Sequence, residues 1–217
     1  MRGDARTPGP PPGPPARPED VQLAVRARLY QRRTVVVWGR LDDLVAGDVA
    51  AELMTLDALG DEPIELAISS AGGTLDAALA LVDVIDLLGV PVHATCLGQL
   101  EGPPVAVLAV CARRVAAPHA RFRLVEEPVE LAGAPGDLES FVRDHRARLG
   151  AFARRVAEAT GRHRPDEVAA DFAAGRFLSA EEAVRYGLVD EVGRPDARLV
   201  RLPRAGRAPG FGFRARD

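Results

Sequence analysis

The stretch from residue 90 to residue 110 constrains the fold of this chain more than any other. An apolar, β-rich run from Val90 to Cys96 is followed by Gly102-Pro103-Pro104 and then by a second apolar run that favours a helix. This order predicts a strand, a tight turn and a helix, which presents the apical side chain and the amides after it at a helix N-terminus, where negative charge is favoured. A hydrolase carries Ser or Cys at that apex. This chain has Gly102 there, and Pro103 after it has no N–H to donate.

Two further strand-turn-helix units precede this stretch. The β-branched run from Thr34 to Trp38 predicts a buried strand. Leu41-Asp42-Asp43 then provides a turn and a cap for a helix that reaches about Leu59. Residues 64–68 predict the next strand, which leads into a turn containing Gly72 and Gly73 and then into another helix. The repetition predicts an α/β fold, and we expect the amides of the two glycine turns to converge on one pocket.

The second half of the chain combines short strands with one long helix. A polar helix is expected from Asp137 to about Ala159, and a helix of that length and polarity projects from the body or packs against another subunit. Pro165 opens a short helix that reaches Asp171, and a capping box from Ser179 to Glu182 opens another. Strands are expected over residues 114–117, 121–125, 188–192 and 199–202.

Composition narrows the class of protein. With 47% hydrophobic and 27% charged residues, the chain of 217 residues has the balance of a soluble globular protein. The net charge of −3 and the lack of a basic patch interleaved with aromatics argue against nucleic-acid binding. No apolar run approaches the roughly 18 residues of a membrane span. Cys96 and Cys111 have no C-x-x-C spacing, so we expect reduced thiols in a cytoplasmic protein with no metal site and no cofactor.

The two ends differ in composition from the rest of the chain. Residues 1–18 are rich in proline and glycine, which predicts a disordered arm. Residues 203–217 are rich in arginine and glycine and predict a flexible tail. The remaining residues, 19–202, are expected to form one domain.

Four motifs together resemble a known family. They are Ile68-Ser-Ser-Ala-Gly-Gly73, similar to a family motif Asn-Ser-Pro-Gly-Gly; Leu97-Gly-Gln99, similar to Gly-Gln-Ala-Ala-Ser-Met; Thr160-Gly161; and the pair Arg176-Phe-Leu-Ser-Ala-Glu-Glu-Ala183 and Tyr186-Gly-Leu-Val-Asp190. From about Leu29 to Val192 the chain resembles the proteolytic subunit of the ATP-dependent Clp protease, ClpP, of peptidase family S14. The resemblance implies the ClpP/crotonase fold, heptameric rings stacked through the long helix, and a Ser-His-Asp peptidase supplied with substrate by a Clp ATPase.

Most of the chemistry that the resemblance implies is missing. The nucleophilic Ser of the family falls on Gly102, and the Met whose amide helps to bind the oxyanion falls on Pro103. The family's His falls on Val125, whereas its Asp falls on Asp171, which is retained. Gly72 and Gly73 keep the other half of the oxyanion hole, although a tight turn before a helix explains them equally well. The chain is therefore expected to be a catalytically degenerate member of the family.

Three interpretations follow from this mapping. The leading one is a non-catalytic ring component, a pseudoprotease with a structural or regulatory role in protein degradation, because acylation needs the nucleophile, the base and the oxyanion donors together. An alternative is an active serine-type endopeptidase with unusual residues, in which Glu101, Glu126 or Glu127 clusters with Asp171 for acid/base chemistry. A third is a crotonase-like acyl-CoA binder that places the Gly72 and Gly73 amides on a thioester carbonyl.

Overall fold

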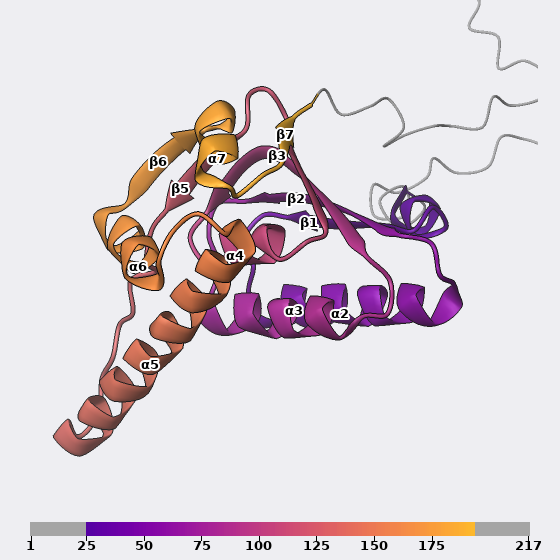
Figure 1. Ribbon diagram of the computed structural model, residues 1–217. Coiled ribbons are helices and arrows are strands. Elements are labelled where there is room, and N and C mark those ends of the chain that lie inside the picture. The colour runs from indigo at the N-terminus through magenta and orange to yellow at the C-terminus, as the bar shows by residue number, and fades with distance from the viewer. Residues whose placement is uncertain (1–24, 194–217) are drawn as a thin grey trace, which may run out of the picture.

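A parallel β-sheet runs through the centre of the molecule. The computed structural model describes residues 25–193, and within them the sheet has the order β1-β2-β3-β4-β7 (Figure 1). These strands are β1 (Thr34–Trp38), β2 (Ile64–Ser70), β3 (Val92–Glu101), β4 (Arg113–Ala116) and β7 (Glu191–Val192), each parallel to its neighbour. Because parallel strands need crossover connections, this order accounts for the helices between the first strands. The predicted α/β class, built from repeated strand-turn-helix units, is confirmed.

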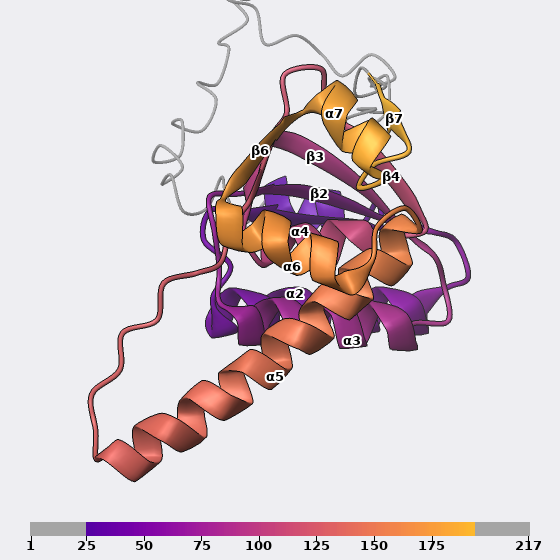
Figure 2. The same ribbon diagram turned by 60° about the vertical axis from the view of Figure 1, so that its left-hand side comes forward.

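Two helices cover one face of this sheet side by side (Figures 1 and 2). They are α2 (Asp43–Leu59) and α3 (Leu75–Leu87), and both begin where the sequence predicts. The Asp42 carboxylate accepts a hydrogen bond from the Val45 N–H at 2.9 Å, and the Thr74 hydroxyl accepts one from the Ala77 N–H at 3.1 Å. Such N-caps contribute about 1 kcal/mol each to helix stability. The apolar face of α2 buries Ala46, Val49, Leu53 and Leu56.

Strand β3 is longer than its sequence suggests. Residues 97–101 were expected to form a turn, yet β3 continues to Glu101. Its first half pairs with β4, whereas residues 99–101 pair with β5 (Arg121–Leu124), and the register with β2 shifts between Ile68 and Ser70. The predicted turn is present only from Gly102 onward, because pairing with β2 and β5 imposes strand geometry on residues 97–101, a stretch of low intrinsic β-propensity.

The last third of the chain forms a small antiparallel ribbon with helices around it. Strand β6 (Arg176–Ser179), which the sequence analysis did not predict, pairs antiparallel with β5. It lies between α6 (Pro165–Ala174) and α7 (Ala180–Tyr186). The predicted capping box of α7 is confirmed, with Ser179 and Glu182 bonding each other's backbone N–H groups.

Helix α5 projects from the body. It covers Pro135–Thr160, and Figures 1 and 2 show its first turns extending away from the sheet and from the other helices. Its buried residues all lie in its second half, from Phe152 to Thr160. Arg148 and Arg155 pair with Asp76 and Asp86 of α3, which ties this half to the body. The predicted long, polar, projecting helix is confirmed.

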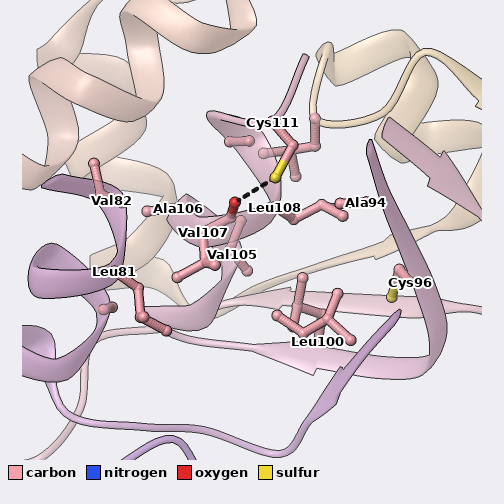
Figure 3. Packing of buried hydrophobic residues seen from close by; sticks show 14 of the residues in the cluster. Leu81, Val82, Ala94, Cys96, Leu100, Val105, Ala106, Val107, Leu108 and Cys111 are labelled. Atoms are coloured by element: carbon pink, nitrogen blue, oxygen red, sulfur yellow. Dashed lines mark hydrogen bonds between the residues drawn. The ribbon is translucent and has the colours of Figure 1, made fainter. Parts of the chain in front are cut away.

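The core between the sheet and α3 contains both cysteines. Figure 3 shows Leu100 of β3 packed near the short helix α4 (Pro104–Ala109), whose six residues are all buried. Cys96 and Cys111 are free thiols in this core, and Cys111 donates to the Val107 carbonyl at 3.1 Å. Burial raises the pKa of each thiol to about 12, so neither forms a thiolate near neutral pH.

Several expectations concern parts of the chain beyond the described range. The arm over residues 1–18, the strand over 199–202, the tail over 203–217 and both domain limits, 19 and 202, lie outside residues 25–193. Within that range no helix has the length and apolarity to cross a bilayer, and no group of three His, Cys, Asp or Glu side chains is placed to hold a metal ion. Residues 188–190 precede β7 without pairing as strand, so only the last two residues of that predicted strand form it.

We predict that Gly73→Ala destabilises the fold by about 2–3 kcal/mol or more. A Cβ at residue 73 would lie 2.5 Å from the Leu41 carbonyl oxygen and 2.8 Å from the Leu41 Cβ, both parts of the rigid core. The matched control is Gly47→Ala in α2, where a Cβ meets nothing within 4 Å. That substitution should stabilise by up to about 1 kcal/mol through helix propensity. Urea unfolding measures both, and equal effects of the two substitutions would contradict the close approach.

Candidate functional site

The turns that follow β2 and β3 meet at the carboxyl edge of the sheet. A Cβ on Gly73 would lie 3.1 Å from the Pro104 ring, so the first turn touches the start of α4. The Leu41 N–H donates to the Gly72 carbonyl, and the Thr74 N–H donates to the Leu41 carbonyl, each at 2.9 Å. The three chain segments therefore form one packed unit at the edge where ligands bind in open parallel sheets.

Gly102 and Val125 face each other within this unit. Gly102 has a φ of +65°, and its N–H donates to the Arg123 carbonyl at 2.9 Å. A Cβ built on Gly102 would lie 3.2 Å from the Val125 carbonyl oxygen and 3.8 Å from its Cγ1. The positions equated with the family's nucleophile and base are thus adjacent in space, but neither residue has a heteroatom in its side chain.

The N-terminus of α4 offers no amide to a ligand. Pro103 and Pro104 have no N–H, and the next two N–H groups, of Val105 and Ala106, donate to the carbonyls of Gly102 and Pro103 at 3.1 and 3.0 Å. Amides exposed at this turn were expected from the sequence. That expectation was wrong because the helix bonds its own first donors, so no anion-binding set remains there.

The turn at Gly72 and Gly73 has backbone N–H groups without a carbonyl acceptor, but it is partly covered. Within residues 25–193, the N–H groups of Gly72 and Gly73 donate to no backbone carbonyl. Arg40 lies above this turn, with its Nη1 3.4 Å from the position of a Cβ on Gly72, and it pairs with Glu127. The guanidinium therefore fills the space in front of Gly72.

Asp171 is bound by neighbours other than a histidine. Its carboxylate accepts hydrogen bonds from Arg176 Nη1 at 3.0 and 3.1 Å and from the Tyr186 hydroxyl at 2.9 Å. Arg176 belongs to β6 and Tyr186 to α7, so the carboxylate of α6 joins three elements. Asp171 is thus held in a structural network.

Aromatic contacts extend this network. The His163 ring stacks on the Tyr186 ring with centroids 4.0 Å apart, and the Arg176 guanidinium lies 5.5 Å from the same ring. Burial, together with the hydrogen bond to Asp171, raises the pKa of the Tyr186 hydroxyl above its usual range. Tyr186 therefore stays protonated and continues to donate to Asp171.

Three of the four carboxylates considered for acid/base chemistry each lie beside an arginine. Glu101 lies 3.8 Å from Arg123, Glu127 pairs with Arg40, and Asp171 pairs with Arg176. Glu126 donates its backbone N–H to the Phe172 carbonyl at 3.2 Å. A pair of carboxylates that shares a proton requires a hydrogen bond between the two groups. In the described part of the chain, no such bond joins any two of these four carboxylates.

A cavity of about 300 Å³ lies beside Val125 and Pro103. Its walls are mostly apolar and come from α3, α5 and α6: Leu75, Phe141, Leu149, Phe152, Ala169 and Phe172. Its rim includes the acidic residues Asp76, Glu126, Glu127 and Glu130. We call this the site cavity. The size is at the low end of the roughly 300–1,000 Å³ typical of ligand pockets.

The lining of the site cavity includes one histidine, which the sequence analysis missed. His145 of α5 lines it, with its ring stacked on Phe141 at 5.7 Å between centroids. The spacing of His145, Leu149, Phe152 and Ala153 places them on one helix face, and this pattern could have indicated the residue. The only hydroxyl in the lining, that of Thr74, donates to Asp43 at 3.3 Å and caps α3. The lining can therefore hold an apolar group but provides no free hydroxyl and no thiol.

We predict that Asp171→Ala destabilises the protein by about 1–3 kcal/mol, because it leaves the Tyr186 hydroxyl without an acceptor. Arg176→Gln should cost less than about 1 kcal/mol, since the side chain of Arg176 is 47% exposed. The matched control is Asp83→Ala, an exposed carboxylate on α3. Thermal unfolding measures all three variants. A loss at Asp171 no larger than at Asp83 would contradict the structural role of this carboxylate.

Comparison with known proteins agrees with this architecture. Residues 18–196 match the family described as Clp protease. The chain is 37% identical over 177 residues to a putative ATP-dependent Clp protease proteolytic subunit-like protein of Streptomyces coelicolor, a match covering 76% of this chain and 81% of that protein. It is 31% identical over 171 residues to ATP-dependent Clp protease proteolytic subunit 1 of Corynebacterium diphtheriae, with the same shares covered. The sheet of seven strands and its helices are consistent with the ClpP fold, and the chain belongs to the Clp protease family.

Proposed function

We propose that this chain is a non-catalytic subunit of a Clp protease complex. The observation that carries the proposal is the contact between Gly102 and Val125, the positions equated with the nucleophile and the base. A Cβ on Gly102 would lie 3.8 Å from Val125 Cγ1, so the two positions are close enough for a Ser and a His to interact. The fold thus keeps the spacing of the site, and the side chains that would perform acylation are absent from it.

Two further observations support a non-catalytic role. The turn at Pro103 and Pro104 lacks donors for an oxyanion, and the loss of one such donor alone costs roughly 10²–10³ in rate. Asp171 accepts hydrogen bonds from Arg176 and Tyr186, which use the carboxylate that would otherwise orient a histidine. In this mapping the nucleophile, the base and one oxyanion donor are therefore missing, and the retained carboxylate has other partners.

The alternatives receive less support from the geometry. An endopeptidase that uses carboxylates would need a close pair, whereas Glu101, Glu127 and Asp171 each contact a separate arginine. An acyl-CoA binder would need an open approach to the Gly72 amide, and Arg40 lies over that glycine. The ring component remains the function that fits the site best.

We further propose that the chain acts within a ring, alone or with catalytic ClpP subunits, in a complex that works with a Clp ATPase. The relatives are named as proteolytic subunits 1 and 2 of ATP-dependent Clp proteases, and we extend subunit membership to this chain. Large apolar side chains at its surface suit contacts between subunits. Trp38 and Leu44 are 70% and 77% exposed, and Phe141 and Val142 are exposed on the projecting part of α5.

The wild-type chain should not hydrolyse fluorogenic peptides or react with a fluorophosphonate. Gly102→Ser alone should also stay unreactive, because Val125 cannot take its proton and Pro103 provides no oxyanion donor. Labelling should first appear in the triple variant Gly102→Ser, Val125→His, Pro103→Met. Mass spectrometry of the intact labelled protein measures the outcome.

Controls separate this result from contamination and from folding defects. The protein is purified from a host lacking its own ClpP, and each variant is checked for a cooperative thermal transition. If the wild type hydrolyses peptides and either Asp171→Ala or Glu126→Ala abolishes this activity, the carboxylates catalyse the reaction. The non-catalytic proposal would then be wrong.

Ring assembly is tested separately. Co-expression with a catalytic ClpP subunit should yield a mixed ring, or the chain alone should form one, and native mass spectrometry distinguishes the two. Val142→Asp should weaken this association, because a charge buried at an interface is costly. It should leave the unfolding temperature of the dissociated chain unchanged, because Val142 is exposed there. A monomer under both conditions would contradict the ring.

A further inference from the structure

Four carboxylates surround the site cavity, and two of them have no ion-pair partner among the described residues. Of the four rim carboxylates, Asp76 pairs with Arg148 and Glu127 pairs with Arg40. Within residues 25–193, Glu126 and Glu130 have no ion-pair partner, and both are exposed. The lining contains no arginine, and His145 is its only residue that can become cationic. An apolar cavity with such a rim suits an aromatic or aliphatic side chain flanked by positive charges.

The C-terminal part of this same chain has that chemistry. Residues 194–217 contain seven arginines and two aspartates, and they include Phe211 and Phe213 close to the arginines at 207, 214 and 216. The first 24 residues make a poor match, because three arginines there are balanced by three acidic residues and no aromatic residue is present. The C-terminal segment is therefore the complementary one.

The length of the segment permits this contact. Phe211 comes 18 residues after Gly193, the last residue described, and an extended chain of that length spans up to about 60 Å. A compact body of this size has a radius of gyration of about 15 Å, so an extended segment of that length is long enough to reach the site cavity.

We propose that residues 203–217 of this chain bind the site cavity. One of the two phenylalanines enters the cavity and packs against the rings of Phe141, Phe152 and Phe172 that line it, and the flanking arginines pair with Glu126 and Glu130. This proposal does not depend on whether the chain is catalytic, because it concerns occupancy of the cavity and is tested by binding.

The test uses full-length chains and a fluorescein-labelled peptide of residues 203–217, with binding measured by fluorescence anisotropy. The wild type is compared with the variant Phe211→Ser, Phe213→Ser, whose own segment can no longer fill the cavity. A tethered segment has an effective concentration of order millimolar, so the peptide should bind the variant roughly tenfold or more tightly than the wild type. Equal affinity for the two proteins would overturn the proposal.

Charge reversal then locates the contact. Adding Glu126→Lys and Glu130→Lys to the serine variant should weaken peptide binding roughly tenfold, and the loss should shrink at high salt. The matched control, Asp83→Lys on the exposed side of α3, should leave the affinity unchanged. Equal losses from both changes, or none from the first, would overturn the proposal. A second copy of the chain in the cavity would dissociate on dilution. The peptide would then bind the wild type and the serine variant equally weakly at high protein concentration and equally more tightly at low concentration, and this result would also overturn the proposal.

Discussion

The close approach of Gly73 to the backbone of Leu41 is the constraint on which the site depends. A parallel bridge joins these residues, and the space between them admits no side chain at position 73. The bridge fixes the end of β2 against the segment between β1 and α2, and it brings Gly73 against the Pro104 ring. Thr74 follows Gly73 immediately and caps α3, so the contact between Gly73 and Leu41 fixes where α3 begins. It thereby also positions Thr74 and Leu75, which line the site cavity.

The backbone holds the site together without help from the side chains that the family uses for chemistry. The turn at Gly102 is fixed by its N–H bond to Arg123 and by the Val105 N–H, both of which are independent of the side chain at position 102. Val125 follows β5 directly, and its position is set by the pairing of β5 with β3 and β6. The backbone around Gly102 and Val125 is therefore held by hydrogen bonds and strand pairing that do not depend on which side chains stand at these two positions.

Local signals in the sequence were sufficient for much of the fold. The β-branched run at Thr34–Trp38, the caps at Asp42 and Ser179, and the long polar helix all formed where predicted, because each is determined by neighbours within a few residues. The extension of β3 to Glu101 and the strand β6 were missed, since both exist through pairing with β5. Strand formation of that kind depends on partners distant in sequence, which single-sequence patterns do not reveal.

At the site, too, contacts between elements that are distant in sequence were the ones that the sequence did not predict. The resemblance identified Gly102 and Val125 as equivalent positions, and the structure brings them together. It did not indicate that Tyr186 and Arg176 bind Asp171, nor that His145 lines the cavity beside Val125, because these contacts join α6, α7, β6 and α5 across the fold.

The arginines around the site give three of its acidic residues a structural role. Arg40 contacts Glu127, Arg123 contacts Glu101, and Arg176 contacts Asp171. The first pair joins the segment after β1 to the segment after β5, the second joins the paired strands β5 and β3, and the third joins β6 to α6. These carboxylates therefore hold segments of the site in place, and our proposal of a non-catalytic subunit draws on this structural use of acidic side chains.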